Sequence, residues 1–265
     1  MFKFNRKIHK SVRDDSVVEV SEVSGVRSLH LGTVTIQSSM KVKDPFALEL
    51  AYTRGMMGFL LFSDAVKNVL TIGLGGGSVP KYIYANCINI EQTIVEINPQ
   101  IISIARSHFY VPDNEDRFNV MEGDGIAYLA DNPNSADCLM IDAFDSFGIP
   151  PNFCSQDFFD SCEMALTNNG IFAINLWGSD KNFDIYLQRI EQSFNNQTLM
   201  LPTGKPGNIV VFGFKSDSKF NSAKLNPKKL KERAKVLEET HNIEFSSFVE
   251  KLCNQLDQLE THKQI

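Results

Sequence analysis

Short apolar segments alternate with amphipathic segments through residues 69–194. The apolar segments have the length and aliphatic content of buried strands, and the segments between them carry the apolar spacing of helices. We predict strands over 69–73, 92–98, 118–124, 136–144 and 170–177, and helices beginning at Pro99 and running over 155–166 and 183–194. Repeated strand–helix units predict a doubly wound parallel sheet of the α/β class.

The C-terminal part of the chain departs from this alternation. Segments 198–203 and 208–214 are apolar, and only a short glycine- and proline-containing segment separates them. Because so short a connection has no room for a crossover helix, these strands should pair as an antiparallel hairpin. After Asn226-Pro227, apolar residues recur at helical spacing in two stretches, which predicts two amphipathic helices.

The N-terminal part has a different pattern of hydrophobic and polar residues. Residues 16–37 predict two or three short strands with a turn at Ser24-Gly25, and Val34 and Ile36 alternate with polar neighbours. Asp44-Pro45 is a helix start signal, so we expect a helix from there to about Phe62. The expected organisation is a small β-unit with a linking helix (1–62), a Rossmann-like catalytic domain (63–215) and a helical tail (216–265).

Composition narrows the class of protein. The chain has 265 residues, 43% of them hydrophobic, and a net charge of −6, so it suits an α/β domain and does not favour a nucleic-acid partner. No apolar run approaches the roughly 18 residues that cross a bilayer, and no secretory signal is evident. Five scattered cysteines without CxxC spacing favour reduced thiols, so we expect a cytoplasmic protein.

A glycine-rich turn follows the first predicted strand of the sheet. Gly73 and Gly75 lie between that strand and the next helix, where they allow a ligand to approach the backbone. Glu96 ends the second strand, about 20 residues later, where an acid binds the two hydroxyls of a ribose. Together they predict a nucleoside site, although a glycine-rich turn by itself is a weak signal.

Three further acids follow predicted strands. Asp124, in Gly123-Asp124-Gly125, either accepts from an adenine amine or caps the next helix. Asp142 and Asp145 follow the fourth strand, at the edge of an open α/β sheet where ligands bind. Two carboxylates three residues apart can hold a cationic amine and accept its proton.

Four motifs in order carry a family resemblance: V-L-x-I-G-x-G-x-G, V-E-I-N, G-D-G and I-D-A-F-D. This order resembles the spermidine synthase family, the polyamine aminopropyltransferases, over roughly residues 16–214. The resemblance implies the Rossmann-like class I methyltransferase fold, a parallel sheet closed by an antiparallel hairpin, with a small N-terminal β-unit. It also implies transfer of an aminopropyl group from decarboxylated S-adenosylmethionine to a small-molecule amine, by a homodimer that needs no metal.

The resemblance implies a role for each candidate residue. Asp142 would be the base, Asp145 would hold the acceptor amine, and Tyr52 would line the acceptor channel. The nucleoside donor would contact Gln37, Gly73, Gly75, Glu96, Asp124 and Gly125.

Departures from the family pattern keep two other functions open. Gly76 stands where the family has an acid that binds the donor's ammonium, and Arg54 stands where it has a glutamate. If Arg54 faced the acceptor it would repel a diamine such as putrescine, whereas an outward-facing Arg54 would not. Trp177 stands in place of a Gln-rich loop and either covers the site or serves packing. The alternatives are an S-adenosylmethionine-dependent methyltransferase and a non-catalytic nucleoside-binding protein.

Overall fold

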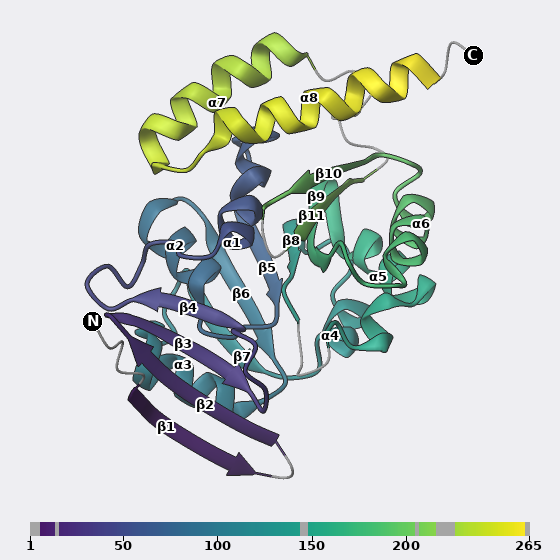
Figure 1. The fold of residues 1–265 in the computed structure, drawn as a ribbon. Helices are drawn as coiled ribbons and strands as arrows, with labels where there is room; N and C mark the ends of the chain where they lie inside the picture. The colour runs from purple at the N-terminus through teal and green to yellow at the C-terminus, as the bar shows by residue number, and fades with distance from the viewer. Residues whose placement is uncertain (1–5, 14–15, 144–147, 205–206, 216–225, 263–265) are drawn as a thin grey trace.

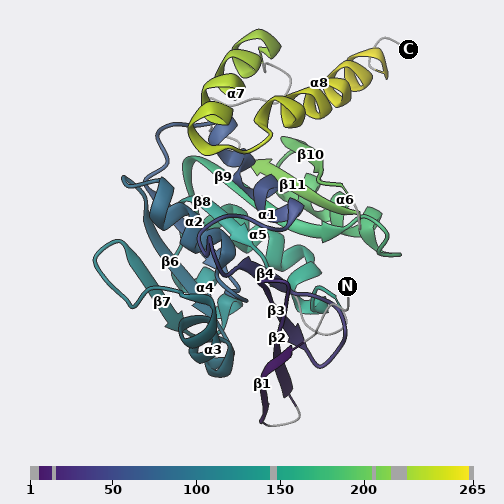
Figure 2. The same ribbon diagram turned by 60° about the vertical axis from the view of Figure 1, so that its left-hand side comes forward.

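The computed structural model describes residues 6–13, 16–143, 148–204, 207–215 and 226–262. Within them lie a four-stranded and a seven-stranded sheet. Figures 1 and 2 show the small sheet beside α3 and, at the opposite end of the large sheet, a pair of helices formed by α7 and α8. These elements have the bounds α3 (Pro99–Phe109), α7 (Pro227–His241) and α8 (Phe245–His262).

The small sheet is antiparallel throughout. Its order is β1 (Arg6–Arg13), β2 (Ser16–Val23), β3 (Val26–Leu31) and β4 (Ser38–Lys41). The turn at Ser24-Gly25 is confirmed, but the strand expected around Val34 is not. Gly32 adopts a φ of +67° and ends β3, and Val34 is 96% exposed, so no partner strand or core supports the alternation there.

The helix expected from Asp44 begins seven residues later, at α1 (Ala51–Met56). Asp44 instead bridges back to Lys41: its amide donates to the Lys41 carbonyl at 3.1 Å, and its carbonyl accepts from Ala47. These bonds form a turn at Asp44, and no helix continues from it. The predicted end is close to the observed one, because the 3-10 helix η1 (Met57–Leu61) continues α1.

The large sheet confirms the predicted fold class. Its order is β10-β11-β9-β8-β5-β6-β7, parallel from β9 to β7, with β10 and β11 added as the predicted antiparallel hairpin. Its strands are β5 (Asn68–Ile72), β6 (Glu91–Glu96), β7 (Phe118–Glu122), β8 (Ala136–Ile141), β9 (Leu166–Trp177), β10 (Thr198–Pro202) and β11 (Asn208–Phe214). Every strand predicted in this sheet is present.

Side-chain caps explain where several helices begin. Asn98 accepts from the amide of Gln100 ahead of Pro99, and Ser155 and Asn226 cap their helices in the same way. The remaining elements are α2 (Ser78–Asn86), α4 (Gly125–Asp131), η2 (Pro151–Cys154), α5 (Gln156–Ala165) and α6 (Phe183–Ser193). The helices predicted at Pro99, over 155–166 and over 183–194 are thus found within a residue or two of their expected bounds.

Apolar side chains cover both faces of the large sheet. One face packs against α4, α5 and α6, for example through Phe159 and Phe172. The other face packs against α1, α2 and the C-terminal helices, whose Phe245 and Val249 are fully buried in the same cluster. A third cluster joins the small sheet to α3 and thereby holds that sheet near the carboxyl ends of β5 and β6.

Candidate active site

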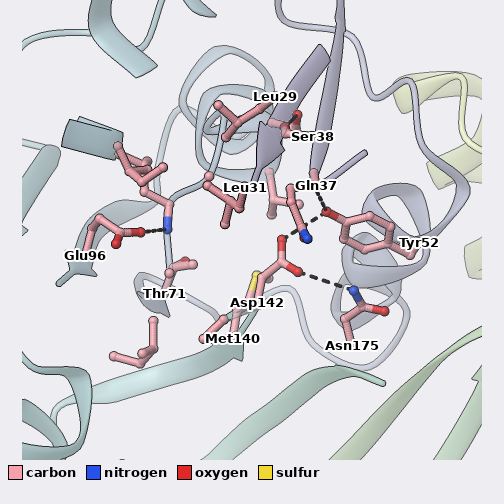
Figure 3. Close-up of a pocket in the computed structure, with 18 of the residues that line it drawn as sticks. Leu29, Leu31, Gln37, Ser38, Tyr52, Thr71, Glu96, Met140, Asp142 and Asn175 are labelled. Atoms are coloured by element: carbon pink, nitrogen blue, oxygen red, sulfur yellow. Dashed lines mark hydrogen bonds between the residues drawn. The ribbon is translucent and has the colours of Figure 1, made fainter. Parts of the chain in front are cut away.

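A cavity of about 820 Å³ opens at the carboxyl ends of the parallel strands. Its walls come from the glycine-rich turn after β5, the ends of β6, β8 and β9, and residues 34–38 of the small sheet's last connection. It is lined by every predicted site residue that the structure describes, namely Gln37, Tyr52, Gly73, Gly75, Glu96, Asp124, Gly125 and Asp142. Asp145 lies outside the described residues. Figure 3 shows four of the lining residues, Gln37, Tyr52, Glu96 and Asp142, each from a different segment of the chain.

The glycine-rich turn packs directly onto the end of β8. Gly73 has a φ of +95°, and a Cβ at this position would lie 2.5 Å from the carbonyl oxygen of Asp142. The amide of Asp142 donates to the Ile72 carbonyl at 3.0 Å. A glycine is therefore required at position 73, and its absence of a side chain brings the nucleoside turn next to the proposed base.

Glu96 is buried at the end of β6, with 8% exposure. One carboxylate oxygen accepts from the amide of Leu74 at 2.9 Å, and the other accepts from the amide of Asn98 at 2.9 Å (Figure 3 shows the first bond). Burial raises the pKa of Glu96, and these backbone donors oppose that rise. Glu96 therefore holds the glycine-rich turn in place while it lines the cavity where a ribose diol would bind.

Asp124 lies at the rim of the cavity. Its Oδ1 accepts from the amide of Ile126 at 2.8 Å, so it caps α4 as one of the two sequence interpretations expected. A carboxylate has several acceptor positions, so the cap leaves capacity for an adenine amine. Gly125 next to it is buried against Ile72, where a side chain would collide.

Asp142 receives two side-chain donors inside the cavity. The hydroxyl of Tyr52 lies 3.3 Å from Oδ2, and Nδ2 of Asn175 lies 3.3 Å from Oδ1 (Figure 3). Burial raises the pKa of Asp142 to about 6, although both donors favour the ionised form. A carboxylate in this setting can take a proton at neutral pH.

Tyr52 lies between Gln37 and Asp142 in the cavity lining. Its hydroxyl lies 3.2 Å from the backbone carbonyl of Gln37 as well as close to Asp142. Burial, and then the nearby negative charge of Asp142, raise the pKa of Tyr52 well above its ordinary value. The hydroxyl therefore keeps its proton and can donate either to the carboxylate or to the small sheet.

Of the two orientations considered for Arg54, the structure shows the one that faces away from the cavity. Its Nε lies 3.0 Å from both carboxylate oxygens of Glu244, which precedes α8. Its Nη1 donates to the carbonyls of Leu48 and Glu49. Arg54 does not line the cavity. The outward orientation holds because the C-terminal helices bring Glu244 to this side of α1.

The structure also accounts for the missing acid at position 76. A Cβ on Gly76 would lie 2.6 Å from Oγ of Ser38, so the side chain of Ser38 already fills that space. Ser38 and Ser78 are both buried, their hydroxyls lie 3.1 Å apart, and both line the cavity. A side chain at position 76 would therefore collide with Ser38, and a pair of hydroxyls lies in the cavity lining beside this turn.

Sequence reasoning assigned no role to three polar residues in the cavity lining. Thr71 is 2% exposed on β5, and its Oγ1 has no hydrogen-bond partner among the described residues. Asn175 contacts Asp142, and Asn208 donates to Asn175 at 2.9 Å. The available signal was a polar residue inside a strand that is otherwise apolar, but it does not say which residue lies opposite.

Within the described ranges, no three His, Cys, Asp or Glu side chains are grouped so that they could hold a metal ion. Across the same residues, no helix has the length and hydropathy needed to span a membrane. All five cysteines are described, and none forms a disulfide.

Comparison with known proteins agrees with the geometry of the cavity. Residues 49–224 match the family described as the spermine/spermidine synthase domain. A polyamine aminopropyltransferase of Chromobacterium violaceum is 37% identical over 262 residues, covering 99% of both chains. Another, from Neisseria meningitidis, is 39% identical over 229 residues and covers 86% of both chains.

Solved structures share the fold. A spermidine synthase in complex with the transition-state analogue AdoDATO has a TM-score of 0.71 at 20% identity, covering 91% of this chain and 85% of that one. Human methyltransferase-like protein 13, in complex with SAH, has a TM-score of 0.64 at 25% identity and covers 72% of this chain and 92% of its own. With its sequence motifs, its cavity and its full-length curated relatives in agreement, the chain belongs to the spermine/spermidine synthase family.

Proposed function

We propose that this protein transfers the aminopropyl group of decarboxylated S-adenosylmethionine to a small-molecule amine. The observation that carries the proposal is the position of Asp142: a carboxyl with a pKa of about 6 faces the cavity that Glu96 and the glycine-rich turn also line. Full-length relatives named polyamine aminopropyltransferase support the same reaction.

The donor nucleoside would lie along the ends of β5 and β6. Its ribose hydroxyls would donate to Glu96, and its adenine would reach the rim near Asp124 and Gly125. Gly73 and Gly75 would let its sulfonium approach the backbone beside Asp142, with Gln37 on the opposite wall.

The proposed reaction is a single displacement. The acceptor's nitrogen lone pair forms a bond to the propyl carbon next to the sulfonium, and the carbon–sulfur bond breaks with its electron pair going to sulfur. Methylthioadenosine leaves, and the proton lost by the amine goes to Asp142. Because both reactants are held in one cavity, positioning lowers the barrier alongside proton removal.

Inside the cavity, the pKa of the acceptor's ammonium and the pKa of the Asp142 carboxyl move closer together. A free aliphatic amine has a pKa near ~10, so it arrives as an ammonium ion. Desolvation lowers the pKa of that ammonium and raises the pKa of the Asp142 carboxyl, here to about 6. Both shifts make transfer of the proton to Asp142 easier than it would be in water. Tyr52 and Asp145, by family resemblance, would position the acceptor.

The donor's own ammonium needs acceptors in place of the missing acid. Ser38, Ser78 and Thr71 bring hydroxyls into the buried part of the cavity lining, and Thr71 Oγ1 has no partner among the described residues. We place the aminopropyl end there, because a desolvated ammonium requires several oxygen acceptors.

Incubation with decarboxylated S-adenosylmethionine and a panel of amines tests the proposal. Mass spectrometry should detect methylthioadenosine and an amine heavier by one aminopropyl group. Methyl transfer from S-adenosylmethionine, without methylthioadenosine, would instead establish the second candidate function. That candidate is favoured by the uncharged donor-tail region around Gly76 and by the fold shared with methyltransferase-like protein 13.

Two further expectations come from the family resemblance and from the scattered cysteines, respectively. We expect a homodimer, which light scattering coupled to size-exclusion chromatography would detect as twice the 29.8 kDa chain mass. We also expect a cytoplasmic location, which fractionation of the source cells with an antibody against the protein would test.

A further inference from the structure

A chain of three polar side chains crosses the floor of the cavity. Asn208, the first residue of β11, donates from Nδ2 to Oδ1 of Asn175 at 2.9 Å. Asn175, on β9, donates from Nδ2 to Oδ1 of Asp142 at 3.3 Å. All three residues line the cavity, and the two asparagines are 9% and 2% exposed.

Asn208 affects which end of the Asn175 amide is directed at Asp142. The amide of Asn175 has a donor end and an acceptor end, and only the donor end favours an ionised carboxyl at Asp142. Asn208 presents a donor to Asn175, so it favours the orientation in which the Asn175 oxygen faces away from Asp142. Little water reaches these buried groups, so an unpaired amide oxygen there is costly.

The backbone holds Asn208 in place. Its carbonyl accepts from the amide of Thr203 at 3.0 Å and from the hydroxyl of Thr203 at 2.9 Å, and both bonds close the β10–β11 hairpin. Asn208 pairs with Trp177 in the β9–β11 register, which places it diagonally from Asn175 on the same face. The β10–β11 hairpin is therefore connected to Asp142 through the side chains of Asn208 and Asn175.

We propose that Asn208 is a positioning residue that, through Asn175, keeps a hydrogen-bond donor directed at Asp142. The inference rests on the proposed function, in which Asp142 accepts the proton. Nothing else known of this chain assigns Asn208 a role.

Among the described residues, few other charged groups line the cavity that contains Asp142. The donor from α1 is Tyr52, and the other charged side chains in the described lining are Glu96 on β6 and Asp124 before α4. That lining contains no Lys, Arg or His. A change in Asp142 titration upon altering Asn208 would therefore report the amide chain rather than the loss of a nearby cation.

The test compares Asn208→Leu, Asn175→Leu and the double variant. The acidic limb of kcat against pH should move up by about half a pH unit or more in Asn208→Leu, and by about one in Asn175→Leu, because each change removes support for the carboxylate. Adding Asn208→Leu to Asn175→Leu should move it no further, because Asn208 acts through Asn175. Activity at high pH should recover in each.

A second readout does not require turnover. Carbon-13 NMR of Asp-labelled protein, with Asp142→Asn to assign the signal, should show the same rise in the Asp142 pKa. Asn208→Ala, which removes the amide donor and introduces no charge, should raise that pKa even if the leucine variant misfolds.

An unchanged Asp142 pKa in Asn208→Leu and Asn208→Ala would overturn the inference, as would a shift that persists when Asn175 is already leucine. A raised acceptor KM with an unmoved acidic limb would make Asn208 a substrate contact instead and would also overturn it. If the wild-type protein transfers no aminopropyl group, the proposed function fails, and the NMR titration still decides the role of Asn208.

Discussion

The hydroxyl of Tyr52 lies 3.3 Å from Oδ2 of Asp142, across 90 positions of sequence. The contact joins α1, which precedes the large sheet, to the end of β8. It couples the wall of the cavity to the proposed base, because a change in Tyr52 changes the environment in which Asp142 titrates.

Asp142→Asn should abolish proton transfer without removing the nucleoside site. The amide keeps the size of the carboxyl but cannot take up a proton, so we expect kcat to fall by a factor on the order of 10² or more. Methylthioadenosine affinity, measured by calorimetry, should stay within about threefold, because Glu96 and the glycine-rich turn are unchanged. Near-normal turnover would show that the proton leaves by another route.

The pH dependence of turnover should reflect Asp142. The carboxyl must be ionised to accept a proton, so kcat should fall as pH decreases through about 6. Tyr52→Phe removes a hydrogen bond that lowers the Asp142 pKa, so the limb should shift to higher pH and activity near neutrality should drop. Stopped-flow or discontinuous assays from pH 5 to 9, limits chosen at roughly one unit or more beyond that pKa, would measure it. A limb that stays in place in the phenylalanine variant would contradict this coupling.

Glu96→Gln should weaken nucleoside binding for two reasons. One oxygen becomes an NH₂ group, so the side chain loses an acceptor for the ribose or presents a donor to the amide of Leu74 or Asn98. Loss of charge-assisted hydrogen bonds worth ~2–3 kcal/mol should reduce methylthioadenosine affinity at least about tenfold. Thermal melting in parallel separates disruption of the turn from loss of the ribose contact, and unchanged affinity would remove Glu96 from the site.

Arg54→Met should change stability but not acceptor recognition. Its guanidinium is held by Glu244 and by the Leu48 and Glu49 carbonyls, so its removal should lower the free energy of unfolding by about 1–3 kcal/mol. The acceptor KM should remain within about twofold, because the side chain does not line the cavity. Glu244→Gln serves as the matched partner variant. A large gain in putrescine affinity in Arg54→Met would place this charge at the acceptor after all.

Thr71→Val should weaken binding of a nucleoside that carries the aminopropyl ammonium and leave binding of one without it unchanged. Valine has nearly the same shape but no hydroxyl, so affinity for decarboxylated S-adenosylmethionine should fall about ten- to a hundredfold, the loss expected for one hydrogen bond to a charged group. Methylthioadenosine has no ammonium, and its affinity should not change. Thr71→Ser keeps the hydroxyl and should behave like wild type in calorimetry. Equal losses for both ligands would place Thr71 outside the donor-tail region.

Local patterns in the sequence predicted most of the large sheet. The strands are short and uniformly apolar because both of their faces are covered, and Asn98-Pro99 and Asn226-Pro227 mark helix starts through their own side chains and ring geometry. The motif order also identified the family and pointed to Glu96 and Asp142, because ligands of open α/β sheets bind at the carboxyl ends of the strands.

Local patterns failed where the fold does not form the helix start or the strand pairing that the residues suggest. Asp44-Pro45 has the composition of a helix start, but bonds to Lys41 and Ala47 turn the chain there instead. Val34 and Ile36 alternate like strand residues, but they line the rim of the cavity and pair with no strand.

The sequence by itself determined the order of strands and helices, the closing hairpin and the acids at the sheet edge, because those follow from side-chain periodicity and from turn chemistry within a few residues. Only the tertiary structure decided what each polar side chain faces. Arg54 is held away from the cavity by Glu244, 190 positions later, and Asn175 reaches Asp142 because β8 and β9 pair in a register that sets Ile141 beside Ile174. Such pairings depend on how whole elements pack, which no local pattern encodes.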